Sequence, residues 1–483
     1  MSRFKNLIIE TFPLFPHLET AGEIAISLKK KGETVYFFWC GDNLPFADWH
    51  LPFYKRFLGL GFNQKIKKFI RILKNNNIEI IDDVQLSVNL IKKINFWASK
   101  FHGNLNDLKN YKYHNAILGN SVASSLISLR HEKNFIPEKN INLVKKCLIS
   151  SATVYEKSKI VIKKIKPNSL YTFNNRFLIS RPIIEAGKLL KVEKILRHER
   201  GANKFKYEIF EKDIHDYDYR YKLMMNYWKQ GPKTKHLIAN NFFKKQKKIF
   251  NNHFFKNKNK NKKEQREIEA IFKKKDKKII FFASTDYEYE AWTSYVNKKK
   301  YYFKNQLHAL IILKKIVKKL NKHILIIRCH PSKKLNKFEK KDEENILRMK
   351  DGKKIFVIKS SEPINSYELI DKSDIVTTFG STIGIEAFYW RKPSISLREN
   401  TYNKLNILNY PKNEYQLKLM LLQKKTKLKN KTLCFPAGYF SEKFGRSFKY
   451  FNSLGNGEGK LMGTKLTHRS KVANLFINLK KYL

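Results

Sequence analysis

Hydrophobic and polar positions near the N-terminus follow first the period of a strand and then that of a helix. The apolar run at 7–9 predicts a strand, and residues 11–19 predict the loop that follows it. Between residues 21 and 28 the apolar positions recur at i, i+3, i+4 and i+7, and Gly32 follows as a stop signal. A second apolar run at 35–38 predicts another strand. The chain is therefore expected to open with a βαβ unit.

The same alternation is clearest between residues 279 and 397. Short apolar runs predict five strands, and periodic segments between them predict three helices. The expected strands are 279–283, 324–327, 355–358, 375–379 and 394–397, and the expected helices are 305–320, 366–370 and 382–390. This order is typical of a parallel, Rossmann-like α/β sheet, in which ligands bind outside the carboxyl ends of the strands.

The part between these two patterns is less regular. Residues 60–245 have a mostly helical pattern, with a strand at 169–173 and a helix at 181–190. Residues 244–278 consist largely of Lys, Asn and Phe and are too highly charged to form much core, which favours a partly helical linker.

The expected fold is α/β, with two Rossmann-like doubly wound domains facing a cleft. We expect an N-terminal domain over 1–245, a linker over 246–278, a C-terminal domain over 279–450 and a closing segment over 451–483. The last of these is expected to end in an amphipathic helix over 470–483.

Charge adds a second consideration. The chain has 483 residues and a formal charge of +56, from 98 Lys and Arg against 42 Asp and Glu, which raises the possibility of nucleic-acid binding. The excess is spread over most of the chain and is dominated by lysine, which favours genomic composition bias over a nucleic-acid site. The charge also suits attachment to an anionic membrane surface.

The four cysteines are widely separated and form no CxxC pair, so a reducing compartment is expected. No secretory signal and no spanning apolar run is visible, which predicts a soluble, cytoplasmic protein with an optional peripheral attachment to the inner membrane.

The strongest local motif runs from Asp374 to Ala387, where an apolar strand ends in a turn containing Gly380, Ser381 and Thr382. Backbone N–H groups at a helix start, together with the two hydroxyl groups, suit a phosphate. The alternative is an ordinary helix cap with a packing glycine.

The second motif is Arg328, Cys329, His330 and Pro331, directly after the strand at 324–327. It presents two potential cations at the carboxyl edge of the same sheet, although an isolated His-Pro pair can also be a structural turn.

A third loop contains Ser284 and Asp286, which either contact a ligand or cap a helix. In the N-terminal half, His17 and Glu19 lie two apart before a helix and can act together on an acceptor hydroxyl, or Glu19 can cap the helix.

Further cleft candidates follow two apolar runs of the N-terminal half. Asn175 and Arg176 come after the strand at 169–173, and residues 198–201, which include Glu199 and Arg200, are expected in a polar turn. The alternative is that these are solvated turn residues.

Taken together, the His330-Pro331 pair and the run from Gly380 through Ser381 and Thr382 to Glu386 resemble the capsular-polysaccharide and surface-carbohydrate glycosyltransferases of the GT-B type. That group includes bacterial Kdo and sialic-acid transferases. The resemblance covers 279–397 clearly and implies that His330, Pro331, Gly380, Ser381, Thr382 and Glu386 hold the donor nucleotide and its phosphate, with Arg328 as a counter-charge.

Members of this group often carry an acidic-acidic-glycine motif whose carboxylate is the catalytic base. The matching stretch here is Glu199-Arg200-Gly201, in which arginine replaces the middle acid. The resemblance therefore implies Glu199 as base, with His17 and Glu19 as the rival.

The expected activity is metal-independent sugar transfer from a nucleotide sugar, for which a CMP-linked donor is one option, to a glycan or lipid-linked glycan. No cofactor and no metal are expected, since the sequence shows no DxD-like acidic pair and no His/Cys cluster. The alternatives are a nucleotide-sugar epimerase or polyol-phosphate transferase of the same architecture and, from another class, a basic nucleic-acid-binding protein.

Overall fold

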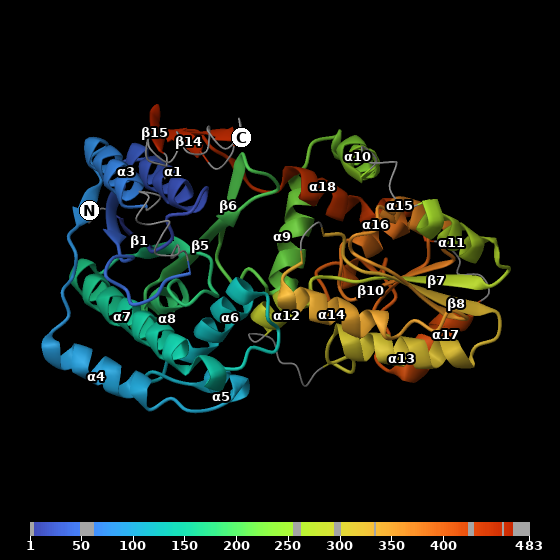
Figure 1. The fold of residues 1–483 in the computed structure, drawn as a ribbon. Coiled ribbons are helices and arrows are strands. Elements are labelled where there is room, and N and C mark those ends of the chain that lie inside the picture. The colour runs from blue at the N-terminus through green and yellow to red at the C-terminus, as the bar shows by residue number, and fades with distance from the viewer. Residues whose placement is uncertain are drawn as a thin grey trace, which may run out of the picture. The chain divides into compact units, whose positions relative to one another are not determined.

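The computed structural model describes residues 4–48, 62–254, 262–293, 301–332, 335–423, 429–455 and 458–466. Two compact units are formed (Figure 1). Unit 1 consists of residues 1–130, 134–216 and 444–483, and unit 2 consists of residues 131–133 and 217–443.

Unit 1 is built on a seven-stranded sheet with the order β12-β6-β5-β4-β1-β2-β3. The five strands from β3 to β5 are parallel, and β6 and β12 add an antiparallel edge. The strands are β1 (Lys5–Glu10), β2 (Thr34–Trp39), β3 (Glu79–Ile81), β4 (Ser169–Phe173), β5 (Lys194–Arg200), β6 (Lys206–Phe210) and β12 (Arg446–Ser447).

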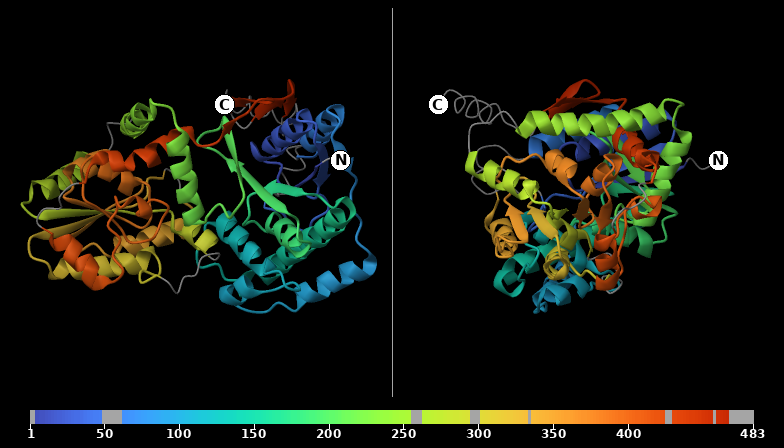
Figure 2. Two further views of the ribbon diagram at one scale, coloured as in Figure 1. Left: turned by 180° about the vertical axis from the view of Figure 1, so that it is seen from behind. Right: turned by 90° about the vertical axis from the view of Figure 1, so that its right-hand side faces the viewer.

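Helices cover both faces of this sheet (Figure 2). One face is covered by α1 and α3, and the other by α7 and α8, because strand side chains alternate between the two faces. The helices of unit 1 are α1 (His17–Lys30), α3 (Asn63–Asn75), α4 (Val88–Ser99), α5 (Leu105–Asn110), α6 (Leu118–Arg130), α7 (Ile141–Ile165) and α8 (Arg181–Leu189).

Near the C-terminus the chain returns to unit 1. A three-stranded antiparallel sheet of β13 (Phe451–Gly455), β14 (Glu458–Leu461) and β15 (Thr464–Leu466) packs on α1 and α3. The carboxylate of Glu23 in α1 accepts hydrogen bonds from the backbone N–H groups of residues 449–451. The helix expected over 470–483 lies outside the described residues.

Unit 2 contains a five-stranded parallel sheet with the order β11-β10-β7-β8-β9. Its strands are β7 (Lys277–Phe282), β8 (His323–Arg328), β9 (Ile355–Ile358), β10 (Ile375–Thr378) and β11 (Ser394–Ser396). Read from β9 to β11, this is the 3-2-1-4-5 order of a doubly wound sheet, and the parallel strands of unit 1 have the same order. The expected fold class, two Rossmann-like α/β domains, is therefore confirmed. The cleft expected between them stays a prediction.

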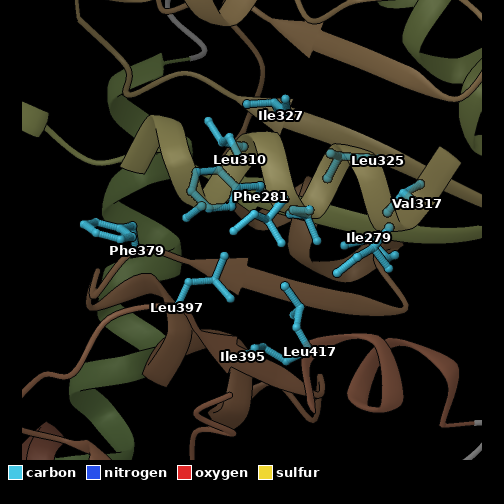
Figure 3. Packing of buried hydrophobic residues seen from close by; sticks show 14 of the residues in the cluster. Ile279, Phe281, Leu310, Val317, Leu325, Ile327, Phe379, Ile395, Leu397 and Leu417 are labelled. Atoms are coloured by element: carbon cyan, nitrogen blue, oxygen red, sulfur yellow. The ribbon is translucent and has the colours of Figure 1, made fainter. Parts of the chain in front are cut away.

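Two hydrophobic cores lie on opposite faces of the unit 2 sheet. Ile279 and Phe281 of β7 belong to one core and Ile280 and Phe282 to the other, as the alternation of a strand requires. Figure 3 shows the first core, in which Leu417 of α17 (Glu414–Leu422) packs against strand residues.

The helices of unit 2 are α9 (Tyr217–Gln230), α10 (Lys235–Phe254), α11 (Lys262–Lys273), α12 (Asp286–Thr293), α13 (Gln306–Lys319), α14 (Lys337–Leu347), α15 (Ser366–Lys372), α16 (Ile383–Tyr389), α17 (Glu414–Leu422) and α18 (Phe435–Lys443).

The domain boundaries differ from those expected. The chain enters unit 2 at residue 217, so residues 217–245 do not belong to the N-terminal domain. The reason is packing: α10 lies along α18, Asn240 accepts a hydrogen bond from the Tyr389 hydroxyl, and Phe243 stacks on the Tyr389 ring at 4.5 Å. Much of the expected linker is thus helix, in α10 and α11.

Candidate functional site

The two phosphate-suited motifs lie on either side of one strand in unit 2. His330 follows β8 and Ser381 follows β10, and both strands pair in parallel with β7. The carboxyl ends of all three strands therefore share one edge, and two strand spacings of about 4.8 Å separate β8 from β10. The side chains of His330 and Thr382 are exposed and that of Ser381 is half-buried, so all three can meet a ligand.

This edge is also where the strand order reverses. From β7 the chain moves to β8 and β9 on one side of the sheet, and then crosses to β10 and β11 on the other. In open parallel sheets the crevice at such a switch point is the usual ligand site.

A cavity of about 310 Å³ opens beside His330 at this edge. It is formed by the loops after β7 and β8 together with α13 and α14, and it contains Ser284, Asp286, His330 and Pro331 of the predicted site residues. Residues 380–382 do not line it. The cavity thus extends from the His-Pro motif away from the Gly380 turn.

Ser284 and Asp286 are both held by other residues of unit 2. The backbone N–H of Ser284 donates to the side-chain oxygen of Gln306, whose amide N–H group donates back to the carbonyl of Ser284. The Nζ atom of Lys133 lies 2.7 Å from Asp286 and 2.8 Å from Asp342. Burial raises the pKa of Asp286, and Lys133 opposes that shift. Both residues shape the cavity wall, and Asp286 is already paired.

The buried position of Arg328 does not fit its expected role as a counter-charge to the donor phosphate. Its side chain is 1% exposed, and its guanidinium group donates to the carbonyls of Lys359, Glu362 and Ile364. Burial lowers its pKa to about 10. These contacts make Arg328 an internal clamp on the loop after β9, because it is the last residue of a buried strand and its side chain is directed inward. We correct the expectation accordingly.

The turn at Gly380 depends on the absence of a side chain. Gly380 has φ +80°, and a Cβ atom there would lie 2.7 Å from the Tyr289 hydroxyl oxygen. The following hydroxyls are weakly engaged: Ser381 Oγ is 3.5 Å from the N–H of Ile383, and Thr382 makes no side-chain cap bond. The helix α16 is only seven residues long, so the hydroxyls and loop N–H groups, rather than a helix dipole, are what this turn offers a phosphate.

Glu386 is partly buried one turn into α16. Its carboxylate accepts a short hydrogen bond from the Tyr367 hydroxyl, and burial raises its pKa to about 7 while that bond lowers it. A carboxyl group with such a pKa can accept or donate a hydrogen bond near neutral pH.

In unit 1 the structure brings two rival candidates for the base together. His17 begins α1 after β1, and Glu199 lies in β5, with β4 between the two strands. The Nδ1 atom of His17 lies 3.8 Å from Oε1 of Glu199. Glu199 is in a strand and not in the expected polar turn, because β5 pairs with β4 on one side and with β6 on the other.

This pair is held in place from several directions. Oε2 of Glu199 accepts from the side-chain N–H group of Asn174 at 2.5 Å, and Oε1 accepts from the backbone N–H of Arg200 at 2.9 Å. The His17 ring packs on Phe173 with a centroid distance of 4.0 Å. Burial lowers the pKa of His17 to about 4 although Glu199 raises it, so the imidazole is neutral at pH 7.

The His17 side chain keeps a small exposed part although its Nδ1 atom is buried. The side chain is 17% exposed, and Nδ1 has no hydrogen-bond partner among the described residues. At 3.8 Å the contact between Nδ1 and Oε1 is longer than a hydrogen bond, and a neutral imidazole that carries its proton on Nδ1 keeps a lone pair on Nε2.

Glu19 is corrected. Its side chain is fully buried, and Oε1 lies 2.6 Å from Nζ of Lys65, which is also buried. Lys65 further donates to the carbonyl of Pro13 at 2.7 Å. Burial raises the pKa of Glu19, and Lys65 opposes this. Glu19 therefore fixes the loop before α1 and does not act as the partner of His17.

The other unit 1 candidates occupy the same sheet edge. Asn175 is buried, and its backbone N–H donates to the Asn174 side chain. The Arg176 guanidinium donates to the hydroxyls of Ser124 and Ser128, at 3.2 and 2.8 Å. The Arg200 side chain is exposed.

Two buried acids at this edge have no clear signal in the sequence. Glu10 ends β1, is fully buried and lies 2.5 Å from Nε2 of His198, whose side chain is also fully buried. Burial raises the pKa of Asp48 to about 7, with Ser125 and Arg176 lowering it. The only sequence signal for Glu10 is its place directly after the apolar run of the first strand. Acids in that place are also common at exposed strand ends.

Within the part of the chain that the structure describes, no group of three or more His, Cys, Asp and Glu residues is arranged to hold a metal ion. No described helix combines the length and the apolar character required to cross a bilayer.

No family model matches the chain, and no curated protein matches it significantly. Among solved structures, the UDP-GlcNAc 2-epimerase from Neisseria meningitidis bound to UDP-GlcNAc is 11% identical, with 99% of this chain and 100% of that chain covered and a TM-score of 0.27.

Two structures of KpsC from Thermosulfurimonas dismutans are also similar. The β Kdo 2,7 transferase is 15% identical, over 67% of this chain and 89% of that one, with a TM-score of 0.34. The β Kdo 2,4 transferase is 12% identical, over 56% and 79%, with a TM-score of 0.35. Likeness at these TM-scores assigns no function to this chain.

Proposed function

We propose that this protein is a glycosyltransferase that moves a sugar from a nucleotide-activated donor to a growing surface or capsular polysaccharide. One observation carries the proposal: His330 after β8 and the hydroxyls of Ser381 and Thr382 after β10 lie at the same sheet edge, on the two strands that flank β7. We infer that a diphosphate or monophosphate bound at this switch point contacts groups from both strand ends.

The donor half of the reaction belongs to unit 2. As the bond from the anomeric carbon to phosphate breaks, the departing phosphate gains negative charge, and fixed donors already at that position stabilise it. Partial desolvation lowers the pKa of His330, although Glu288 raises it. His330 is therefore a neutral hydrogen-bond donor at pH 7, and Ser381 and Thr382 supply hydroxyl donors at the same sheet edge, on the other side of β7.

The acceptor half belongs to unit 1. His17, neutral and oriented by Glu199, takes the proton of the acceptor hydroxyl as that oxygen attacks the anomeric carbon. This assignment gives each of the two rival bases a role. The His17 imidazole takes the proton, and the Glu199 carboxylate stabilises the imidazolium that forms. The acceptor class is a glycan or lipid-linked glycan.

The first experiment is a thermal-shift screen with CMP, UDP, GDP and CDP compounds. A ligand that binds only the folded protein at about 100 times its Kd stabilises it by about 2.7 kcal/mol. A response selective for CMP points to a CMP-linked donor, and the responding nucleotide is then used in the assays below.

The double variant His330→Ala, Ser381→Ala is expected to lose this response and sugar transfer while its ligand-free melting temperature stays near that of the wild type. His102→Ala, an exposed histidine of unit 1, is the matched control. If the double variant keeps the full response and wild-type turnover, the donor assignment is wrong.

Product analysis separates transfer from epimerisation. A transferase releases the nucleotide only when an acceptor glycan is present, apart from slow hydrolysis. Conversion of a nucleotide sugar to its epimer without any acceptor would replace the proposal with an epimerase.

A further inference from the structure

The short helix α17 is apolar on two sides although it lies at the surface of unit 2. Leu417 and Leu421 point into the core, as Figure 3 shows for Leu417. Tyr415, Leu419 and Leu422 face outward and are 68%, 45% and 42% exposed. Their spacing of i, i+4 and i+7 places them in one stripe. Surface helices normally carry polar residues on the outward face, so this stripe is unusual.

A second stripe on α13 adjoins the first. Ile311 is 51% exposed, and Lys315 and Lys318 follow it at i+4 and i+7. Lys315 Nζ lies 3.2 Å from the carboxylate of Glu414, the first residue of α17, so the two stripes form one surface. Figure 1 shows α13 and α17 on the same side of the unit 2 sheet. We call this surface the α13/α17 face; it consists of Ile311, Lys315, Lys318, Tyr415, Lys418, Leu419 and Leu422.

The exposure is built into the fold and does not come from a loose helix end. The Asn413 side chain caps the start of α17 by accepting from the N–H of Gln416. At its other end, Lys277 Nζ donates to the carbonyls of Leu421 and Gln423, at 2.9 and 2.8 Å. Both ends are therefore fixed while the apolar stripe faces water.

Charge indicates what covers this face. The two helices carry lysines at 314, 315, 318, 319 and 418 and a single acid, Glu414. Glu414 is already paired with Lys315, and Lys318 lies 3.5 Å from Asp351. A second copy of the face would place lysines against lysines, which opposes self-association. On an anionic lipid surface, the lysines contact the negatively charged headgroups and the apolar side chains enter the bilayer. The tyrosine then lies at the membrane–water interface, where tyrosines are enriched.

We propose that the α13/α17 face docks unit 2 on an anionic lipid bilayer, with Tyr415, Leu419 and Leu422 entering the interface and the lysines contacting lipid phosphates. This proposal does not depend on the proposed function. It names the docking site and distinguishes it from adsorption through the charge of the whole chain.

The test places a reporter on the face. All four native cysteines are buried, so a polarity-sensitive dye attached to Leu419→Cys labels one position selectively. Phe96→Cys on α4 is the comparison position, because this helix also exposes Val88, Ile91 and Phe96 near Lys92 and Lys93, but at spacings of i+3 and i+8 that spread them around the helix. With vesicles of phosphatidylcholine and phosphatidylglycerol, the dye at 419 is expected to shift to the blue and become protected from aqueous iodide. The dye at 96 is expected to stay in water, as is the dye at 419 with phosphatidylcholine alone.

The complementary variant replaces the stripe: Tyr415→Ser, Leu419→Gln, Leu422→Gln. At raised salt, where adsorption by charge alone is screened, its binding to the anionic vesicles is expected to fall at least about tenfold. Because the replaced side chains are exposed, its melting temperature and nucleotide response should match those of the wild type. These two readouts keep the result separate from the donor assignment.

Several outcomes would overturn the docking proposal. These are the absence of vesicle binding, an unshifted dye at 419 on protein that does bind, and an equal shift at 96. A dye at 419 that becomes protected without lipid, together with a dimer in sedimentation, would assign the face to a second copy instead.

Discussion

Nδ1 of His17 lies 3.8 Å from Oε1 of Glu199, although one residue begins the first helix of unit 1 and the other is in β5. The carboxyl ends of parallel strands share an edge, so residues far apart in the chain meet there. Asn174, which follows β4 between them, holds the Glu199 carboxylate. The base proposed for this protein is thus assembled from residues in or after three neighbouring strands of one sheet, β1, β4 and β5.

This pair predicts a non-additive loss of activity. His17→Ala and Glu199→Gln should each lower kcat by about 10²- to 10⁴-fold, and the double variant should be no slower than the worse single variant, because the two side chains act as one unit. Single-turnover sugar transfer measures this. Glu193→Gln, an exposed carboxylate of unit 1, is the control. Losses that multiply in the double variant would mean that the residues act separately.

The low pKa of His17 predicts a pH dependence of stability. The folded protein holds His17 neutral down to about pH 4, whereas the unfolded chain takes up this proton near pH 6.5. The unfolded state therefore binds more protons between these values, and the free energy of unfolding falls as pH drops through this window, by at most about 3 kcal/mol from this group.

Urea unfolding at several pH values measures that loss. In His17→Gln the loss between pH 6.5 and 4 should shrink by the same amount. An unchanged slope would mean that the His17 pKa is not lowered by folding.

Arg328 is predicted to act on stability and not on the donor. Arg328→Lys removes the planar group that donates to three carbonyls and leaves buried acceptors unpaired, which should cost about 2–4 kcal/mol of unfolding free energy. Nucleotide binding below the melting temperature should be unchanged. Denaturant unfolding and the nucleotide thermal shift measure the two effects. A variant of normal stability that no longer responds to nucleotide would restore the counter-charge interpretation.

Gly380 is predicted to be constrained by Tyr289 as well as by its own backbone. Gly380→Ala should destabilise the protein by more than about 1 kcal/mol, because φ is +80° and the added Cβ would lie 2.7 Å from the Tyr289 hydroxyl. In a Tyr289→Phe background the same change should cost less, since the contacting oxygen is gone while the backbone strain remains. A double-mutant cycle by thermal unfolding measures the coupling. A coupling near zero would show that the turn moves away from the tyrosine.

The sequence by itself determined the elements whose pattern is local. The strands β7, β8 and β9 of unit 2 contain uninterrupted apolar runs, and the helix α13 keeps a single period, so their residues specify them without distant partners. The turn at 380–382 and the His330-Pro331 pair were recognisable for the same reason, because each is a short motif directly after an apolar strand.

Only the tertiary structure decided what depends on distant partners. Residues 198–201 were expected in a turn, but 198–200 belong to β5, since these polar residues are stabilised by pairing with β4 and β6. Glu19 and Arg328 resembled site residues in the sequence. In the structure, the Glu19 carboxylate pairs with Lys65, and the Arg328 guanidinium donates to the loop after β9. The meeting of His17 with Glu199, and the return of the chain to unit 1 at residue 444, follow from which strands lie side by side. Local periodicity specifies strands and helices, whereas their order in the sheet determines which side chains meet.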